Sequence, residues 1–191
     1  MDLCERLPNK TLVGVLGTLG TWHRRAPGYS LHHLEALVRG FAPDLLCIEV
    51  DRAAWEVGHL AAFPPEYREC LVPLCRQLGI ILVPVGDRWR GLPSPLRLAL
   101  MLGGGPRWVN SAAADRWHRA WARMCSGSGQ ANRELVTHIL EAVRRDPGRR
   151  VLVTVRMERR HAVVTGLHQA DEVTLVPVRT LPKKCGNGQR T

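Results

Sequence analysis

Thr11-Leu-Val-Gly-Val-Leu-Gly17, followed by the turn Thr18-Leu-Gly-Thr-Trp-His23, is the stretch that decides the fold. The run 11–17 is almost entirely apolar, which is typical of a strand buried on both faces of a parallel sheet. A predicted helix follows, and then a second apolar run, which ends on Glu49. In open α/β folds the carboxyl ends of parallel strands meet at one edge, and ligands bind there. We therefore expect any chemistry at the ends of these two strands.

The rest of the chain repeats this alternation of strand and helix. Three further apolar runs predict strands at 80–85, 151–155 and 173–178. Apolar residues at helical spacing predict helices at 31–41, 64–78, 131–145 and 161–169, with a loop at 51–63. The sequence therefore predicts an α/β fold: a mostly parallel central sheet of four to five strands with helices on both faces.

The domain organisation follows from length and from the breaks in this pattern. A chain of 191 residues is long enough for one substantial core, and we expect a single α/β domain over residues 1–180. Prolines, Gly103-Gly-Gly105 and a Ser/Gly joint at 126–129 delimit a helical insertion or lid at about 90–128. Residues 181–191 are expected to form a flexible basic tail.

Composition bounds the class of protein. No apolar run approaches the ~20 residues that span a bilayer, and the first residues lack the pattern of a secretory signal, so we expect a cytoplasmic protein with no membrane partner. The six cysteines form no Cys-x-x-Cys pair, which argues against a zinc knuckle or a thioredoxin-type motif. Buried thiols that act as small apolar groups are the better interpretation.

The chain is strongly basic, with a formal charge of +10, and all but three of its 27 cationic side chains are arginine. Several arginines flank the strand predicted at 151–155, and such a rim attracts phosphate polyanions. No aromatic interleaving or known nucleic-acid motif accompanies them. A solvated surface is therefore the simpler interpretation, and binding of an anionic ligand or a nucleic acid through an Arg-rich rim stays open.

A metal site is a second candidate at the predicted edge. A hydrolytic metal centre needs about three His or carboxylate ligands and an open position for water. His23, Glu49 and His161 supply that number if the strand ends converge, and the ion would be Mn, Co or Zn. The alternative is that both histidines are surface residues and that Glu49 pairs with an arginine such as Arg52.

The order of three segments resembles the Tiki/TraB superfamily, whose relatives include erythromycin esterase-like and ChaN-like haem-uptake proteins. The segments are LVGVLGTLG (12–20), HHLEALVRGFAPDLLCIEVD (32–51) and NRELVTHILEAVRRDPGRRVLVTV (132–155). In that group the first strand ends in Gly-x-x-His and the second in a Glu after Pro-Asp. An Asn/Asp–Arg pair opens a late helix, and the next strand ends in another Gly-x-x-His. Pro43-Asp44, Glu49 and Asn132-Arg133 match this pattern.

Both Gly-x-x-His motifs are degraded here. Gly20 stands where the first histidine belongs, and Gly20-Thr-Trp-His23 restores the motif only three residues later. Arg156-Met-Glu-Arg159 falls on the second motif, and His161 follows two positions late. Because a guanidinium is always cationic, arginine cannot ligate a divalent metal. The resemblance therefore implies that metal-dependent hydrolysis is lost and that Glu49 forms an ion pair with Arg156 or Arg159.

Three classes of function remain open. The first is a catalytically degenerate hydrolase relative, a pseudoenzyme that acts as a binding or regulatory module for an unknown small molecule or protein. The second is an active metal-dependent hydrolase that uses the shifted ligands, with Glu49 as the catalytic residue. The third is the anion or nucleic-acid binder. The candidate ligand-binding residues are Gly17, Thr18, Asn132, Arg133, Arg156 and Arg159.

Overall fold

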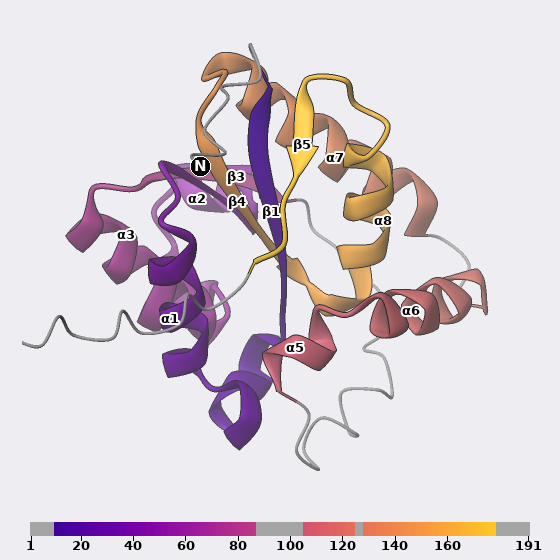
Figure 1. The fold of residues 1–191 in the computed structure, drawn as a ribbon. Helices are drawn as coiled ribbons and strands as arrows, with labels where there is room; N and C mark the ends of the chain where they lie inside the picture. Colours follow the sequence, from indigo (N-terminus) through magenta and orange to yellow (C-terminus); the bar gives the residue numbers. More distant parts are fainter. Residues whose placement is uncertain (1–9, 87–104, 125–127, 179–191) are drawn as a thin grey trace, which may run out of the picture.

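The structure is a computed structural model and describes residues 10–86, 105–124 and 128–178 (Figure 1). Five strands form one sheet in the order β3-β2-β4-β1-β5, and every neighbouring pair is parallel. The strands are β1 (Thr11–Thr18), β2 (Leu45–Asp51), β3 (Ile81–Gly86), β4 (Arg150–Arg156) and β5 (Val173–Leu175). The predicted α/β fold with a parallel sheet is confirmed.

Helices cover both faces of this sheet. On one face lie α1 (Leu31–Phe41), the π-helical turn η4 (Glu66–Leu71) and α3 (Val72–Leu78). On the other face lie α7 (Ser128–Arg145) and α8 (Met157–Leu167), which contact each other (Figure 1). The covering of both faces, which the alternating pattern predicted, is therefore present.

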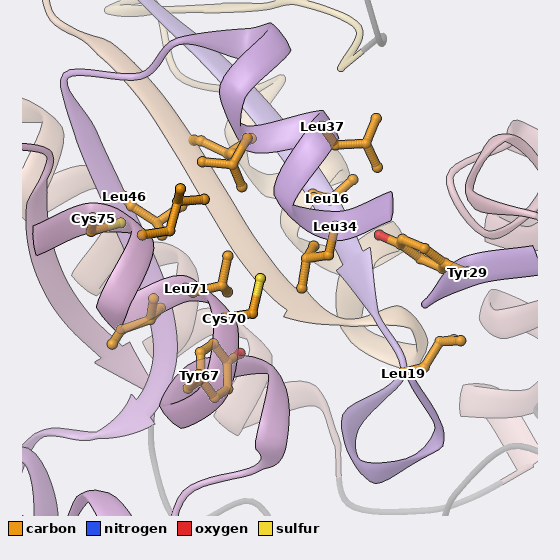
Figure 2. Packing of buried hydrophobic residues seen from close by; sticks show 14 of the residues in the cluster. Leu16, Leu19, Tyr29, Leu34, Leu37, Leu46, Tyr67, Cys70, Leu71 and Cys75 are labelled. Atoms are coloured by element: carbon orange, nitrogen blue, oxygen red, sulfur yellow. The ribbon is translucent and has the colours of Figure 1, made fainter. Parts of the chain in front are cut away.

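Each strand contributes side chains to both faces of the sheet, because successive side chains of a strand point to opposite sides. In β1, Val13 and Val15 pack with α7 and α8, whereas Leu16 joins the cluster around α1. In β2, Cys47 faces the α7 side and Leu46 the α1 side. Figure 2 shows the α1-side cluster, in which Cys70 and Cys75 pack among leucines. The thiols of Cys47, Cys70 and Cys75 are free and buried, as predicted for small apolar groups.

Local signals set the ends of the α1-side helices. Ser30 and the side chain of His33 form a capping box at the start of α1. Gly79 ends α3 in the left-handed region with φ of 68°, which glycine adopts without steric cost. Both helix ends agree with the sequence pattern.

Some predicted boundaries need correction. Residues 51–63 are not a loop: they hold α2 (Arg52–Glu56), capped by the Asp51 carboxylate on the Ala54 amide, and the 3-10 turn η3 (Leu60–Ala62). The joint predicted at 126–129 is partly helical, because α7 starts at Ser128. The predicted helix 161–169 starts at Met157 instead, directly after β4. β5 is only three residues long, although the Val176 amide still bonds to the Val13 carbonyl.

The insertion is described in part. α5 (Pro106–Val109) and α6 (Ala112–Met124) lie in it, and α6 contacts α8. The helix predicted around 96–102 and the tail at 181–191 lie outside the described residues. Within the described ranges, every helix is too short or too polar to cross a bilayer.

Candidate functional site

Glu49 and Arg159 form a buried ion pair at the carboxyl edge of the sheet. Glu49 is near the end of β2 and Arg159 is in the first turn of α8. The Arg159 Nη1 atom lies 3.1 Å from the Glu49 Oε1 atom, and the two side chains are 1% and 2% exposed. The pairing implied by the resemblance is therefore present with Arg159, and the alternative pairing of Glu49 with Arg52 is not. Arg52 donates to the Pro84 carbonyl and pairs with Glu141.

Helix α7 holds the rest of the Arg159 guanidinium. The Nε atom of Arg159 donates to the Asn132 side-chain oxygen over 2.8 Å, and its Nη2 donates to the Ala131 carbonyl. Bonds on three sides fix the plane of the guanidinium against α7 and β2. The predicted ligand-binding residues Asn132 and Arg159 are thus bonded to each other.

The second oxygen of Glu49 is also occupied. Its Oε2 accepts the backbone N–H of Arg156, the last residue of β4 and the one before α8, over 2.6 Å. Burial raises the pKa of the Glu49 carboxyl, and the Arg159 guanidinium and the Arg156 amide act against that rise. Both carboxylate oxygens of Glu49 therefore bind groups of the chain itself.

The end of β1 is closed in a similar way. The Gly17 amide donates to the Asn110 side-chain oxygen over 2.6 Å, and the Gly17 carbonyl accepts the Tyr29 hydroxyl over 2.8 Å. A Cβ atom at Gly17 would lie 3.3 Å from Val109. Thr18 is fully buried, and its hydroxyl donates to the Val155 carbonyl. The polar groups of Gly17 and Thr18, both predicted ligand-binding residues, are thus engaged inside the protein.

His23 is a structural residue of the turn after β1. It is 1% exposed, its Nε2 atom accepts the Leu19 amide over 2.9 Å, and its Nδ1 atom lies 2.7 Å from the Tyr29 carbonyl. A carbonyl only accepts, so Nδ1 carries the proton. Because both ring nitrogens are engaged, no lone pair of His23 is left for a metal.

His161 lies in the second turn of α8 and is also buried. Its Nδ1 atom lies 3.0 Å from the Glu158 carbonyl, so Nδ1 is the donor. Burial lowers the pKa of His161, and Arg119 adds to that lowering. His161 lines a cavity of about 840 Å³ between α7 and α8, together with Asn132 and Arg133 but not Glu49.

The predicted metal set is not brought together. Among the described residues, which include His23, Glu49 and His161, no three His, Cys, Asp or Glu side chains form a group that could hold a metal ion. The cause is local: His23 is bonded into its own turn, and a guanidinium occupies the place beside Glu49. A divalent cation does not fit this donor set, because the Glu49 carboxylate is already neutralised and both nitrogens of His23 are engaged.

The Arg-rich rim is less exposed than its sequence suggests. Arg159 is buried, and Arg160 pairs with Asp115 of α6 and donates to the Val15 carbonyl. Arg159 and Arg160, two of the arginines that flank the strand predicted at 151–155, therefore point into the protein. The predicted ligand-binding residue Arg133 is exposed, but it faces the cavity between α7 and α8.

Sequence reasoning missed Tyr29, Asn110 and the Arg160–Asp115 pair. Tyr29 is fully buried at the end of β1, where burial raises the pKa of its hydroxyl far above the usual range. Asn110 follows a Gly/Pro-rich break and gave no periodic signal. The short helix α5, which Asn110 ends, places it against the strand end.

Comparisons with known proteins add no relative: no family model, no curated protein and no solved structure matches this chain.

Proposed function

We propose that this chain is a catalytically silent relative of the Tiki/TraB superfamily and acts as a binding or regulatory module. The observation that carries the proposal is the buried Glu49–Arg159 pair. In the resemblance, Glu49 matches the motif carboxylate at the end of the second strand, and Arg159 stands where a motif histidine belongs. A metal ion at this position would need a free Glu49 carboxylate, but the Arg159 guanidinium already pairs with it.

The surrounding contacts support the same proposal. The amide and carbonyl of Gly17 and both ring nitrogens of His23 are all engaged by neighbouring groups of the chain. Hydrolysis needs a positioned water and a group that activates it. With these polar groups internally satisfied, the strand ends favour a structural role over a catalytic one.

The two other classes of function are less well supported by the geometry. An active hydrolase with His23, Glu49 and His161 as ligands would require His23 and Glu49 to leave their present partners. Recognition of a nucleic acid through the rim would have to proceed without the guanidinium of Arg159, which is buried.

The proposal is tested by titrating Mn²⁺, Co²⁺ and Zn²⁺ into the full chain by calorimetry. The wild type is compared with a variant in which the motif is restored by Gly20→His, Arg156→Gly and Arg159→His. We expect no saturable site in the wild type and a new site in the restored variant. Adding Glu49→Gln to the restored variant should abolish that site, and circular dichroism checks that each variant is folded.

Two results would count against the proposal in different ways. Stoichiometric metal binding by the wild type, lost in Glu49→Gln, would favour the active hydrolase. A restored variant that is folded but gains no metal affinity would argue against the Tiki/TraB alignment itself.

A further inference from the structure

The cavity between α7 and α8 is lined by neither Glu49 nor Arg159. It has a volume of about 840 Å³, within the range of small-molecule sites. Its walls are one face of each helix, with residues 129–144 of α7 and 161–166 of α8 at helical spacing. Along α7 the lining covers about 22 Å at the α-helical rise per residue, so the cavity is an elongated groove.

The floor of this groove is apolar, and Gly166 determines how closely the two helices approach there. A Cβ atom at Gly166 would lie 2.8 Å from the Val136 side chain, so the absence of a side chain lets α8 approach α7 there. Val136, Leu140 and Ala162 provide aliphatic surface along the groove. Such a floor favours an alkyl or acyl chain, because burial of apolar surface is favourable at ~25 cal/mol per Å².

One end of the groove is cationic. Arg119 of α6 and Arg133 of α7 both line it there, and both are exposed. Within the described ranges neither guanidinium has a carboxylate partner. The same end holds the first turns of α7, an 18-residue helix whose N-terminal amides add positive potential. These groups attract an anionic head group.

His161 adds a polar group directed to the same end. It is 8% exposed, and its Nδ1 proton is used by the Glu158 carbonyl. No described residue bonds to its Nε2 atom, and the side chain lines the groove. An imidazole nitrogen that faces a groove and has no partner among the described residues is a hydrogen-bonding position for a ligand.

The other end has the opposite character. Asp171 and Glu172 line it, and Glu172 pairs with Arg144. Arg144 and Glu172 neutralise each other, and Asp171 leaves that end with a negative charge that repels an anion. The groove therefore has a direction: the head group lies by Arg119 and Arg133, and the chain runs along α7.

We propose that the groove between α7 and α8 binds an amphipathic anion, an alkyl or acyl chain that ends in a carboxylate or a phosphate. Arg119, Arg133 and His161 bind the head group, and Val136 and Leu140 contact the chain. Glu49 and Arg159 do not line this groove, although Asn132, which bonds to Arg159, does. The inference goes beyond the proposed function and does not depend on it.

Calorimetry with four probes at constant ionic strength tests the proposal on the full chain. Octanoate and octyl phosphate carry both required parts, octanol carries only the chain, and inorganic phosphate only the charge. We expect saturable binding of octanoate or octyl phosphate. Octanol should bind about tenfold more weakly or worse because it lacks the charge-assisted contacts. Inorganic phosphate should bind about tenfold more weakly or worse because it lacks the alkyl chain that the groove buries. The tighter of the two anionic probes identifies the head group as carboxylate or phosphate.

Paired variants locate the site. Arg119→Ala with Arg133→Ala should weaken the tighter probe about tenfold or more. The control is Arg116→Ala with Arg145→Ala, which removes two exposed arginines of the same helices that do not line the groove. All four arginines are exposed, so both variants should remain folded.

Four results would overturn the proposal. They are the absence of binding at millimolar octanoate and octyl phosphate, equal affinity for octanol, equal affinity for inorganic phosphate, and an equal loss in the two arginine variants. The last would show attraction by net charge rather than a built site.

Discussion

The Arg159 guanidinium lies 3.1 Å from the Glu49 carboxylate with both side chains almost fully shielded from water. Such a pair is costly to desolvate, and its worth depends on the further bonds that each partner makes. Here Glu49 also accepts the Arg156 amide, and Arg159 also donates to Asn132. The pair therefore ties β2 to the start of α8 and to α7, at the edge where open α/β folds usually bind ligands.

Glu49→Gln should destabilise the protein strongly. The change leaves the Arg159 cation buried without its counter-ion, and the expected loss in the free energy of unfolding is about 3–5 kcal/mol. Chemical denaturation followed by circular dichroism measures it, with the exposed Glu56→Gln as the matched control. Stability equal to that of the wild type would assign Glu49 to a ligand rather than to the fold.

The two residues should also be strongly coupled. In a double-mutant cycle with Glu49→Gln and Arg159→Met, each single change leaves one buried charge unpaired, whereas the double change removes both. We expect the double variant to be more stable than the sum of the single losses predicts, with a coupling of about 1–3 kcal/mol. Additive losses would mean that the two side chains do not act as a pair.

His23→Ala should cost stability without any effect on metal binding. The change removes the acceptor of the Leu19 amide and the donor to the Tyr29 carbonyl, and the expected loss is about 1–3 kcal/mol. The exposed His59→Ala is the control. A zinc or manganese affinity in the wild type that His23→Ala abolishes would contradict the structural role.

Asn110→Ala should loosen the end of β1. Without the Asn110 oxygen the Gly17 amide loses its partner, and its hydrogen exchange should speed up while the Val153 amide in the centre of β4 is unaffected. Asn110→Asp keeps an acceptor oxygen and should retain most of the protection. Equal exchange at Gly17 in all three proteins would show that Asn110 does not close this strand end.

The free energy of unfolding should decrease as the pH is lowered below 6.5, the ordinary pKa of histidine, in part because of His161. Burial lowers the pKa of His161 from 6.5, so the unfolded chain takes up the proton first as the pH falls. The contribution is fully present above pH 6.5 and is lost between that pH and the lower pKa of the folded state. His161→Gln should flatten this part of the stability profile, and the exposed His168→Gln should not. An unchanged slope in His161→Gln would place the titration elsewhere.

The sheet could be predicted from the sequence because its strands are long apolar runs between helical patterns. The placement of Glu49 at the end of β2 follows from the same reasoning, since a strand that ends on a carboxylate places it at the carboxyl edge. The exception was β5, where pairing with β1 stops after three residues although the apolar run continues.

The contacts of the site could be predicted only in part. The resemblance implied an arginine partner for Glu49, but the choice of Arg159 depends on where α8 begins. The helix was expected at 161, and it begins at Met157, so Arg159 is helical and lies beside Asn132. The contact of Asn110 with Gly17 and the groove between α7 and α8 could not be predicted from the sequence, because both arise from packing between segments that are distant along the chain.

The most direct test of the structural role of Glu49 is the metal content of the purified, untagged protein. The protein is incubated with manganese, cobalt and zinc, the excess is removed, and the bound metal is measured by elemental mass spectrometry. We expect far less than one metal ion per chain, because Arg159 already neutralises Glu49. About one ion per chain in the wild type and none in Glu49→Gln would contradict it.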